Sequence, residues 1–280
     1  MNTSVSLAGI CLKNPVMEAS GTFGSGMEYS QFVDLNRLGA VVTKGVADRP
    51  WPGNPTPRIA EVPAGMLNAI GLQNPGLETF IQRDLAFLDD FDTRVVVNVC
   101  GHTEEEYLNV VDALADQKRV DLLEINISCP NVREGGMAFG TDPAMVEYIT
   151  SSVKKRAAQP IIIKLTPNVT SIADVARAAE AGGADGVSLI NTITGMKIDV
   201  DRRTFALANK TGGMSGPAIH PIAVRMVYEA AQAVKIPIIG MGGIASAEDA
   251  LEMILAGATA VAIGTANFYN PRATLDVIEG

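Results

Sequence analysis

Short apolar runs alternate with helical patterns along most of the chain. Several of the runs are apolar at nearly every position, which is typical of strands in a parallel sheet that is covered on both faces. The strands predicted in this way span residues 16–20, 40–44, 94–98, 122–126, 161–166, 186–191, 237–241 and 260–264. Eight strand–helix units in about 250 residues have the size of an α/β protein of the (β/α)8, or TIM, barrel type. An open doubly wound sheet is the alternative fold.

Helix start signals follow several of these strands. Each pairs a capping residue with a residue of the first helical turn: Thr103 with Glu106, Asp142 with Pro143, Ser171 with Asp174, and Ser246 with Asp249. The spacing is that of an N-cap or a capping box. Two of the helices are expected to end at Gly182 and Gly257, and the last helix, around 271–279, is expected to be short.

Three long insertions are predicted at one end of the barrel. They span residues 45–75, 129–141 and 192–217, after the second, fourth and sixth strands. All three leave the carboxyl ends of strands, where barrel enzymes keep their active sites. Loops of this length carry a function or are disordered, and the apolar segment 66–72 argues against disorder. We therefore expect one domain over residues 1–280, with its site at this end.

The composition restricts partners and location. The chain has 22 Lys and Arg against 31 Asp and Glu, and the net charge of −9 argues against a nucleic-acid partner. No apolar run reaches transmembrane length, and the N-terminus lacks the pattern of a signal peptide. Cys11, Cys100 and Cys129 are far apart, so we expect neither disulfides nor an iron–sulfur or other metal site within the chain. Reduced thiols indicate a cytoplasmic protein.

The predicted strands end in polar side chains or bare backbone. These ends are Ser20, Lys44, Asn98, Asn126, Lys164, Asn191 with Thr192, Gly242 with Gly243, and Gly264 with Thr265. A single Asn at such a position commonly caps the next helix, and a single Lys commonly reaches solvent. Two lysines at one barrel mouth, Lys44 and Lys164, indicate an anionic ligand.

Glycine-rich turns after the seventh and eighth strands predict a phosphate site, with simple tight turns as the alternative. Gly242, Gly243 and Gly264 leave the backbone bare where each turn leads into a helix. Barrels bind phosphate at these two loops, where backbone amides and helix N-termini attract anions. Residues 240–245 also fit a relaxed dinucleotide fingerprint, but they do not open a βαβ unit and no acidic residue follows at the ribose position.

Phosphate glycines, amide side chains and a lysine together suit FMN, a phosphorylated cofactor with a planar ring. The Asn side chains offer donors and acceptors to such a ring. Lys164 offers a cation to its reduced, anionic form. The sequence therefore predicts FMN at the barrel mouth.

A cysteine motif follows the fourth strand. Asn126-Ile127-Ser128-Cys129-Pro130-Asn131 places a thiol just past a strand end, before a glycine-containing loop over 133–140. Cysteine at such a place is often a small core residue, whereas a thiol on a loop beyond a strand is placed to react with a ligand. The motif by itself leaves both interpretations open.

These motifs together resemble class 1 dihydroorotate dehydrogenases over essentially the whole chain. The resemblance rests on the Cys129 motif, on residues 66–76 and on the phosphate glycines. The glycines after the cysteine and the run Gly53-Asn54-Pro55-Thr56-Pro57-Arg58 resemble the type B branch. That branch pairs a catalytic FMN subunit with an electron-transfer subunit that carries FAD and a [2Fe–2S] cluster and passes electrons to NAD.

The resemblance implies oxidation of dihydroorotate to orotate in de novo pyrimidine (UMP) biosynthesis, with Cys129 as the general base and hydride transfer to FMN. The implied substrate-binding residues are Lys44, Asn68, Ala69, Ile70, Gly71, Leu72, Asn126, Asn191 and Thr192. The implied FMN-binding residues are Ser20, Lys44, Gly45, Asn98, Asn126, Lys164, Ile190, Gly216, Gly242, Gly243, Gly264 and Thr265. A heterotetramer of two catalytic and two electron-transfer subunits is implied as well.

Three alternatives stay open at this point. One is the type A branch, a homodimer that reduces fumarate. Another is a different flavin barrel that acts on pyrimidines, such as the reductive domain of dihydropyrimidine dehydrogenase. The third is a non-catalytic barrel that binds a phosphorylated metabolite, which would need the glycines but no thiol facing the ligand.

Overall fold

The strands close into a barrel in the computed structural model, which describes residues 2–127, 133–134, 137–138 and 140–280. The barrel strands are β3 (Val16–Glu18), β4 (Ala40–Val42), β7 (Arg94–Val99), β8 (Leu122–Asn126), β11 (Ile161–Lys164), β12 (Gly186–Leu189), β17 (Ile238–Met241) and β18 (Ala260–Ile263). All are parallel, and β18 pairs with β3 to leave no open edge. The predicted (β/α)8 barrel is thus confirmed and the open sheet is wrong. Several strands end one or two residues earlier than predicted.

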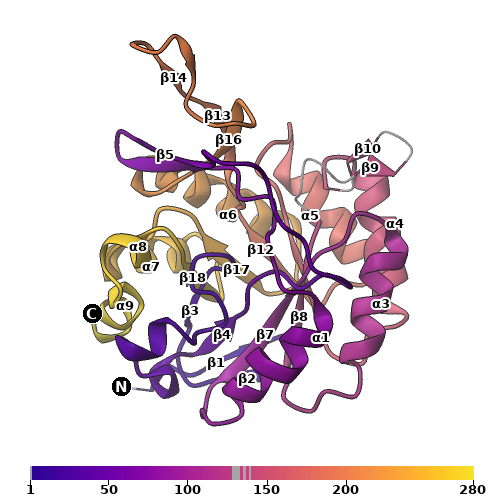
Figure 1. The fold of residues 1–280 in the computed structure, drawn as a ribbon. Coiled ribbons are helices and arrows are strands. Elements are labelled where there is room, and N and C mark those ends of the chain that lie inside the picture. The colour runs from indigo at the N-terminus through magenta and orange to yellow at the C-terminus, as the bar shows by residue number, and fades with distance from the viewer. Residues whose placement is uncertain (1, 128–132, 135–136, 139) are drawn as a thin grey trace.

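Helices surround the barrel (Figure 1). Residues 77–88 form one helical stretch, made of α1 (Leu77–Thr79), η3 (Phe80–Leu85) and α2 (Ala86–Leu88). The others are α3 (Glu104–Leu114), α4 (Pro143–Lys154), α5 (Ile172–Ala181), α6 (His220–Ala233) preceded by η4 (Pro217–Ile219), α7 (Ala247–Leu255), α8 (Ala266–Tyr269) and α9 (Ala273–Glu279). The last helix, α9, is short as predicted, with 7 residues. Within the described residues, no helix is long and apolar enough to cross a lipid bilayer.

The first strand–helix unit departs from the prediction. Between β3 and β4 the chain forms only two single turns, η1 (Tyr29–Gln31) and η2 (Leu35–Arg37). Gly21, Gly24 and Gly26 take φ values of +89°, +61° and +89° in this segment. Such left-handed residues interrupt a helix, so the expectation of eight complete strand–helix units is wrong here.

Most predicted helix starts have the expected caps. The side chains of Asp142, Ser171 and Ser246 accept hydrogen bonds from backbone N–H groups in the first turns of α4, α5 and α7. The capping box at Ser246 is complete. The helices α5 and α7 end just before Gly182 and Gly257, close to the predicted positions.

The capping box predicted at Thr103 is only half formed. The Thr103 hydroxyl accepts from the Glu106 N–H, as expected. The Glu106 carboxylate, however, accepts from the backbone N–H of His102 and pairs with Arg49 at 2.8 Å. Arg49 lies in the insertion after β4, so a long-range ion pair competes with the local cap.

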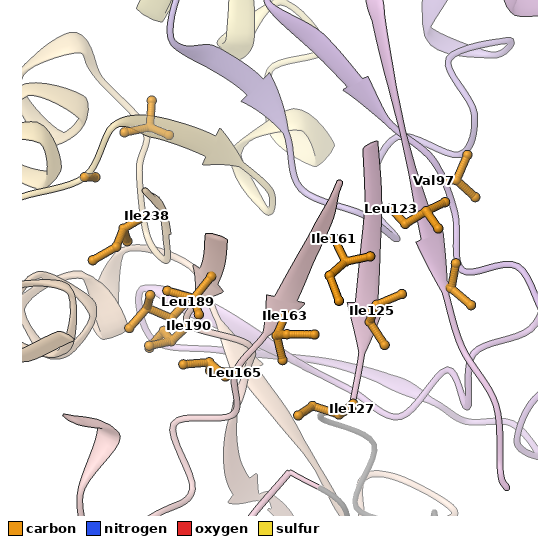
Figure 2. Packing of buried hydrophobic residues seen from close by; sticks show 14 of the residues in the cluster. Val97, Leu123, Ile125, Ile127, Ile161, Ile163, Leu165, Leu189, Ile190 and Ile238 are labelled. Atoms are coloured by element: carbon orange, nitrogen blue, oxygen red, sulfur yellow. The ribbon is translucent and has the colours of Figure 1, made fainter. Parts of the chain in front are cut away.

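Strand alternation divides the barrel side chains into two layers. Outward-pointing residues share one apolar cluster with residues of the helices. Figure 2 labels five of them: Val97, Leu123, Ile125, Ile163 and Leu189. Inward-pointing residues form a separate apolar cluster, which includes Met17, Ala40, Val96, Leu122, Ile162, Ile239 and Ala260. Further along the same inward faces the buried side chains become polar: Asn98, Glu124, Lys164 and Ser188. The barrel interior is therefore apolar at its amino end and polar at its carboxyl end.

A hairpin that the sequence analysis did not predict covers the apolar end. It consists of β1 (Val5–Leu7) and β2 (Ile10–Leu12), which pair antiparallel. Leu7 and Leu12 are fully buried and belong to the inward apolar cluster. The hairpin lies at the end of the barrel opposite β5, β13 and β16 (Figure 1). It seals the interior from water.

The long insertions after β4 and β12 fold together over the other end. They form one antiparallel sheet in the order β13 (Ile193–Met196), β16 (Thr211–Ser215), β6 (Gly65–Asn68) and β5 (Ile59–Val62). The hairpin of β14 (Ile198–Asp199) and β15 (Thr204–Phe205) projects beyond this sheet (Figure 1). In the insertion after β8, β9 (Arg133–Glu134) pairs with β10 (Met137–Ala138). The predicted insertions after β4 and β12 are confirmed in position, and most of the predicted insertion 129–141 lies outside the described residues.

Replacing Leu12 with Ala should destabilise the protein by about 2–5 kcal/mol, because a fully buried side chain of the barrel seal leaves a cavity. The neighbouring Cys11 is exposed, so Cys11→Ala is a matched control with little expected effect. Urea unfolding midpoints measure both changes. Equal midpoints for the two variants would show that the hairpin contributes nothing to the core.

Glu18 is a buried carboxyl group in the layer between barrel and helices. Met17 points into the barrel, so by strand alternation Glu18 points outward, on the side where α9 packs against β3. Its side chain is fully buried, and neither carboxyl oxygen has a hydrogen-bond partner elsewhere in the described chain. Burial raises the pKa of Glu18 to about 8, and only its own backbone N–H opposes the shift. The group is therefore mostly neutral near pH 7.

This shift makes stability depend on pH. Between pH 4.5 and about 8 the unfolded chain releases a proton that the folded chain keeps at Glu18, so stability falls as pH rises. The contribution is about 1.4 kcal/mol per pH unit. Glu18→Gln should remove it and flatten the decline in urea midpoint between pH 5.5 and 7.5. Parallel pH dependence in the wild type and the variant would contradict a neutral Glu18.

Candidate active site

A pocket of about 750 Å³ opens among the carboxyl ends of the barrel strands. Every predicted site residue that the structure describes lines it: Ser20, Lys44, Gly45, Asn68, Ala69, Ile70, Gly71, Leu72, Asn98, Asn126, Lys164, Ile190, Asn191, Thr192, Gly216, Gly242, Gly243, Gly264 and Thr265. The volume suits a small-molecule site. The fold thus brings these residues together, and their individual binding roles stay predictions. Another hollow, of about 730 Å³ under the β14–β15 hairpin, contains none of them.

The floor of the pocket is a buried polar network around Glu124. Its carboxylate accepts hydrogen bonds from Asn98 Nδ2 at 2.9 Å and Ser188 Oγ at 3.0 Å. Lys164 Nζ lies 3.7 Å from Glu124 Oε1 and donates to Ser20 Oγ at 3.0 Å. Because Asn98 donates from its nitrogen, its amide is held in one orientation. The network fixes both the Lys164 cation and the Asn98 amide at the bottom of the pocket.

Glu124 and Ser188 are the functional candidates that sequence reasoning missed. Leu122, Glu124 and Asn126 alternate along β8, so they share the inward face of one strand. A carboxylate on the inward face of a predicted strand, two residues before the predicted site residue Asn126, was a sequence signal that could have identified Glu124 as a pocket residue. Its partners, however, lie on β7, β11 and β12, and no local pattern points to them.

Lys44 is the second cation of the pocket, and it is partly buried. Burial lowers the pKa of Lys44, the Cys100 thiol opposes this, and the positive charges of Arg58 and Lys164 lower the pKa further. Cys100 is itself fully buried behind Gly45. An anionic ligand would offset both the desolvation and the neighbouring positive charges, so the pocket favours one.

One wall of the pocket comes from the insertion sheet. Asn68 ends β6 and pairs with Gly213 of β16, and its Nδ2 donates to the Gly213 carbonyl at 3.4 Å. A Cβ at Gly213 would collide with the Thr192 side chain, and one at Gly71 would lie 2.6 Å from Asn54 Cγ. Glycine is therefore required for the backbone of this wall to approach its neighbours so closely.

Asn168, which sequence reasoning also missed, braces the loop after β12. Its Nδ2 donates to the Thr192 carbonyl at 3.1 Å and its Oδ1 accepts from the Thr194 N–H at 2.9 Å. The Thr192 N–H donates to Asn191 Oδ1 at 2.8 Å. These bonds hold the loop that carries Asn191 and Thr192 against the pocket.

Another part of the pocket has bare, left-handed backbone. Gly216, Gly242 and Gly243 take φ values of +102°, +130° and +71°. The N–H groups of Gly243 and Thr265 have no hydrogen-bond partner within the described chain. Free amides and glycines that admit no Cβ fit a phosphate group, and the two lysines and the Asn98 amide fit a planar flavin ring. The residues present therefore fit FMN.

Cys129 lies outside the described residues, as do Ser128, Pro130 and Asn131. The structure does describe the strand end that precedes them. Tyr107 Oη donates to the Asn126 carbonyl at 2.7 Å, so α3 anchors the last residue of β8.

A closed (β/α)8 barrel with a polar, cation-bearing pocket at the carboxyl ends of its strands defines the class of barrel enzymes. Within that class, a sequence profile described as dihydroorotate dehydrogenase matches residues 2–280. The chain therefore belongs to the dihydroorotate dehydrogenase family and is an oxidoreductase. This confirms the resemblance found in the sequence.

Close relatives share nearly the whole length. The chain is 69% identical over 280 residues to "Dihydroorotate dehydrogenase B (NAD(+)), catalytic subunit" of Lachnoclostridium phytofermentans, covering 100% of this chain and 93% of that protein. Proteins with the same description from Alkaliphilus metalliredigens and Thermoanaerobacter pseudethanolicus are 64% and 59% identical, each covering 100% of this chain and 92% of the relative.

Glu124→Ala should cost about 3–5 kcal/mol of stability in the flavin-free protein, because it leaves the Lys164 cation buried without its counter-ion. Glu229→Ala removes one partner of the exposed Arg225–Glu229 pair and should change little. Thermal and urea unfolding of both variants measure the difference. Similar losses for the two would show that the Lys164–Glu124 pair behaves like a surface ion pair.

Proposed function

We propose that this chain oxidises dihydroorotate to orotate in pyrimidine biosynthesis as the FMN-binding catalytic subunit of a type B enzyme. The observation that carries the proposal is the pocket, which gathers the described predicted residues around two lysines, the buried Lys164 and the partly buried Lys44. Family membership and the shared description of the relatives support the substrate. Residues 1–280 act together as one FMN-binding barrel domain in this proposal.

The cofactor occupies the side of the pocket formed by the barrel. Asn98 and Lys164 would hold its ring, and its phosphate would be held by Gly216, Gly242, Gly243, Gly264 and Thr265. Ser20, Lys44, Gly45, Asn126 and Ile190 complete the FMN-binding set. When bound, FMN supplies the hydride acceptor. The Lys164 cation, held by Ser20 and Glu124, stabilises negative charge near the ring.

The substrate occupies the side formed by the insertion sheet. Its carboxylate is drawn to Lys44, and its ring amides meet the side chains of Asn68, Asn126 and Asn191. Residues 69–72 and Thr192 enclose it. The pocket is lined by β6 and β16 on this side, which supports a ligand held between barrel and insertion sheet. Two neighbouring subsites place a substrate carbon next to the hydride acceptor.

Cys129 is the proposed general base. Its thiolate takes a carbon-bound proton onto Sγ as the hydride leaves the neighbouring carbon, which produces the ring double bond of orotate. A free thiol has a pKa of about 8.5, so turnover should rise with pH as the thiol ionises in the enzyme–substrate complex. The motif position, directly beyond the Asn126 end of β8, supports this role.

Electrons leave the reduced cofactor through a second subunit in this proposal. That subunit carries FAD and a [2Fe–2S] cluster and reduces NAD, and two copies of each subunit form a heterotetramer. The printed descriptions of the relatives, with NAD(+) and a catalytic subunit, favour this over a fumarate-reducing type A homodimer. Membership of a dehydrogenase family argues against a non-catalytic metabolite-binding barrel. The exposed free thiol of Cys11 suits a cytoplasmic location.

Anaerobic visible spectra of the FMN-loaded chain test the proposal. Dihydroorotate should bleach the flavin band of the wild type. Cys129→Ala should slow bleaching by about 10²-fold or more, because general-base catalysis contributes this much, while FMN and orotate still bind. Cys11→Ala, at an exposed thiol outside the pocket, is the matched control and should bleach normally.

Three outcomes would count against parts of the proposal. A flavin band that dihydroorotate leaves unchanged in the wild type would move the substrate elsewhere. Normal bleaching in Cys129→Ala would remove Cys129 from the reaction. If the chain alone reduced fumarate as fast as dihydroorotate bleaches its flavin, the type A alternative would be favoured.

A further inference from the structure

His220 lies directly behind the phosphate end of the pocket. It is the first residue of α6, and its side chain is buried. The ring Nδ1 is 2.9 Å from the Gly242 carbonyl oxygen, and the ring Nε2 is 3.1 Å from Glu252 Oε2. Its backbone and Cβ also pack on Gly243, where an added Cβ would lie 2.7 Å from His220 Cβ. The imidazole thus joins α6 and α7 to the loop after β17.

The bond to Gly242 determines where the next N–H points. The carbonyl of Gly242 and the N–H of Gly243 belong to one planar trans peptide unit, so they point in opposite directions. A carbonyl held by His220 therefore directs the Gly243 N–H away from the imidazole. Gly243 lines the pocket, and this N–H has no partner in the described part of the protein. It is available to a ligand.

The loop does not hold this peptide unit by itself. Both flanking residues are glycines, with φ values of +130° and +71° that other residues rarely adopt. Glycine has no Cβ to restrict rotation, so the peptide unit between them is free to turn unless a contact fixes it. On the far side of the loop, the Asp249 carboxylate accepts from the N–H groups of Ala245 and Ser246. His220 holds the near side.

Both ring nitrogens face hydrogen-bond acceptors. The Gly242 carbonyl faces Nδ1, and the Glu252 carboxylate faces Nε2. Asp249 Oδ1 lies farther away, 3.9 Å from Nε2. The Glu252 side chain is 59% exposed, which makes the buried contact with Gly242 the stronger of the two.

We propose that His220 is a positioning residue for the phosphate of the bound cofactor, acting through the peptide unit between Gly242 and Gly243. The inference rests on the proposed FMN function. It assigns His220 a role at the phosphate end alone, so loss of the imidazole should weaken binding of FMN and leave binding of riboflavin, which lacks the phosphate, nearly unchanged.

The test compares the affinities of the flavin-free full-length chain for FMN and for riboflavin, measured by quenching of flavin fluorescence. His220→Ala should weaken FMN binding about tenfold, as expected when the Gly243 N–H is no longer held toward the phosphate and one hydrogen bond to the ligand weakens, and riboflavin binding less than about twofold. His220→Asn, whose Nδ2 mimics the imidazole Nδ1, should restore most of the preference for FMN. His102 is the other of the 2 histidines, and it stacks on Trp51. His102→Ala is therefore the matched control.

The outcomes separate this inference from the proposed function. A wild-type chain that binds FMN no better than riboflavin would contradict the proposed cofactor site itself. A wild-type preference that persists in His220→Ala would overturn the role of His220. Equal weakening of both flavins would also overturn it, because it indicates a general structural defect. If His220→Ala does not fold, His220→Phe replaces it, because phenylalanine fills the same space without a hydrogen-bond donor. The affinities of this variant for FMN and for riboflavin are then compared in the same way.

Discussion

Closure of the barrel is the constraint on which the site depends. A closed parallel sheet turns alternate side chains of every strand inward and brings all strand carboxyl ends to one mouth. In this chain the inward faces are apolar beside the β1–β2 hairpin and polar at the mouth. Glu124 lies where the inward faces change from apolar to polar. A carboxylate buried there is tolerated because Asn98, Ser188 and Lys164 reach it from three other strands. An open sheet would not bring those strands around one group.

The pocket has two parts with different origins. The barrel supplies the rigid floor and the phosphate end, where side chains lie on strands and in short turns. The insertion sheet supplies the facing wall, and it joins Asn68 of one insertion to Gly213 of another, which are 145 positions apart. In the proposed function, a rigid cofactor side and a separate substrate side would meet what hydride transfer requires, since the donor carbon and the acceptor atom must be held close and in line.

The sequence predicted what depends on local patterns. Eight apolar runs were enough to find all barrel strands, and the residues at their ends were enough to find most of the pocket.

The features that the sequence analysis missed depend on contacts between distant segments. The insertions appeared as loops because β5, β6, β13 and β16 are stabilised by each other. Glu124 appeared as a polar interruption of an apolar strand because its partners lie on other strands. The capping box at Thr103 was only half right because Arg49, in the insertion after β4, pairs with the Glu106 side chain. The missing first helix was the exception, since Gly21, Gly24 and Gly26 were visible in the sequence.

The two lysines, which look equivalent in the sequence, differ in the structure. Lys164 is balanced, because Glu124 lies 3.7 Å away and Ser20 accepts its hydrogen bond. Lys44 has two cations and a thiol around it, and burial together with Arg58 and Lys164 lowers its pKa. The protein itself thus supplies Lys164 with a carboxylate partner, whereas the positive charge of Lys44 gains most from an anion that binds beside it. Binding of an anionic ligand at Lys44 and retention of its proton are therefore linked. This difference supports the proposal that Lys164 serves the cofactor, while Lys44 also meets the carboxylate of the substrate.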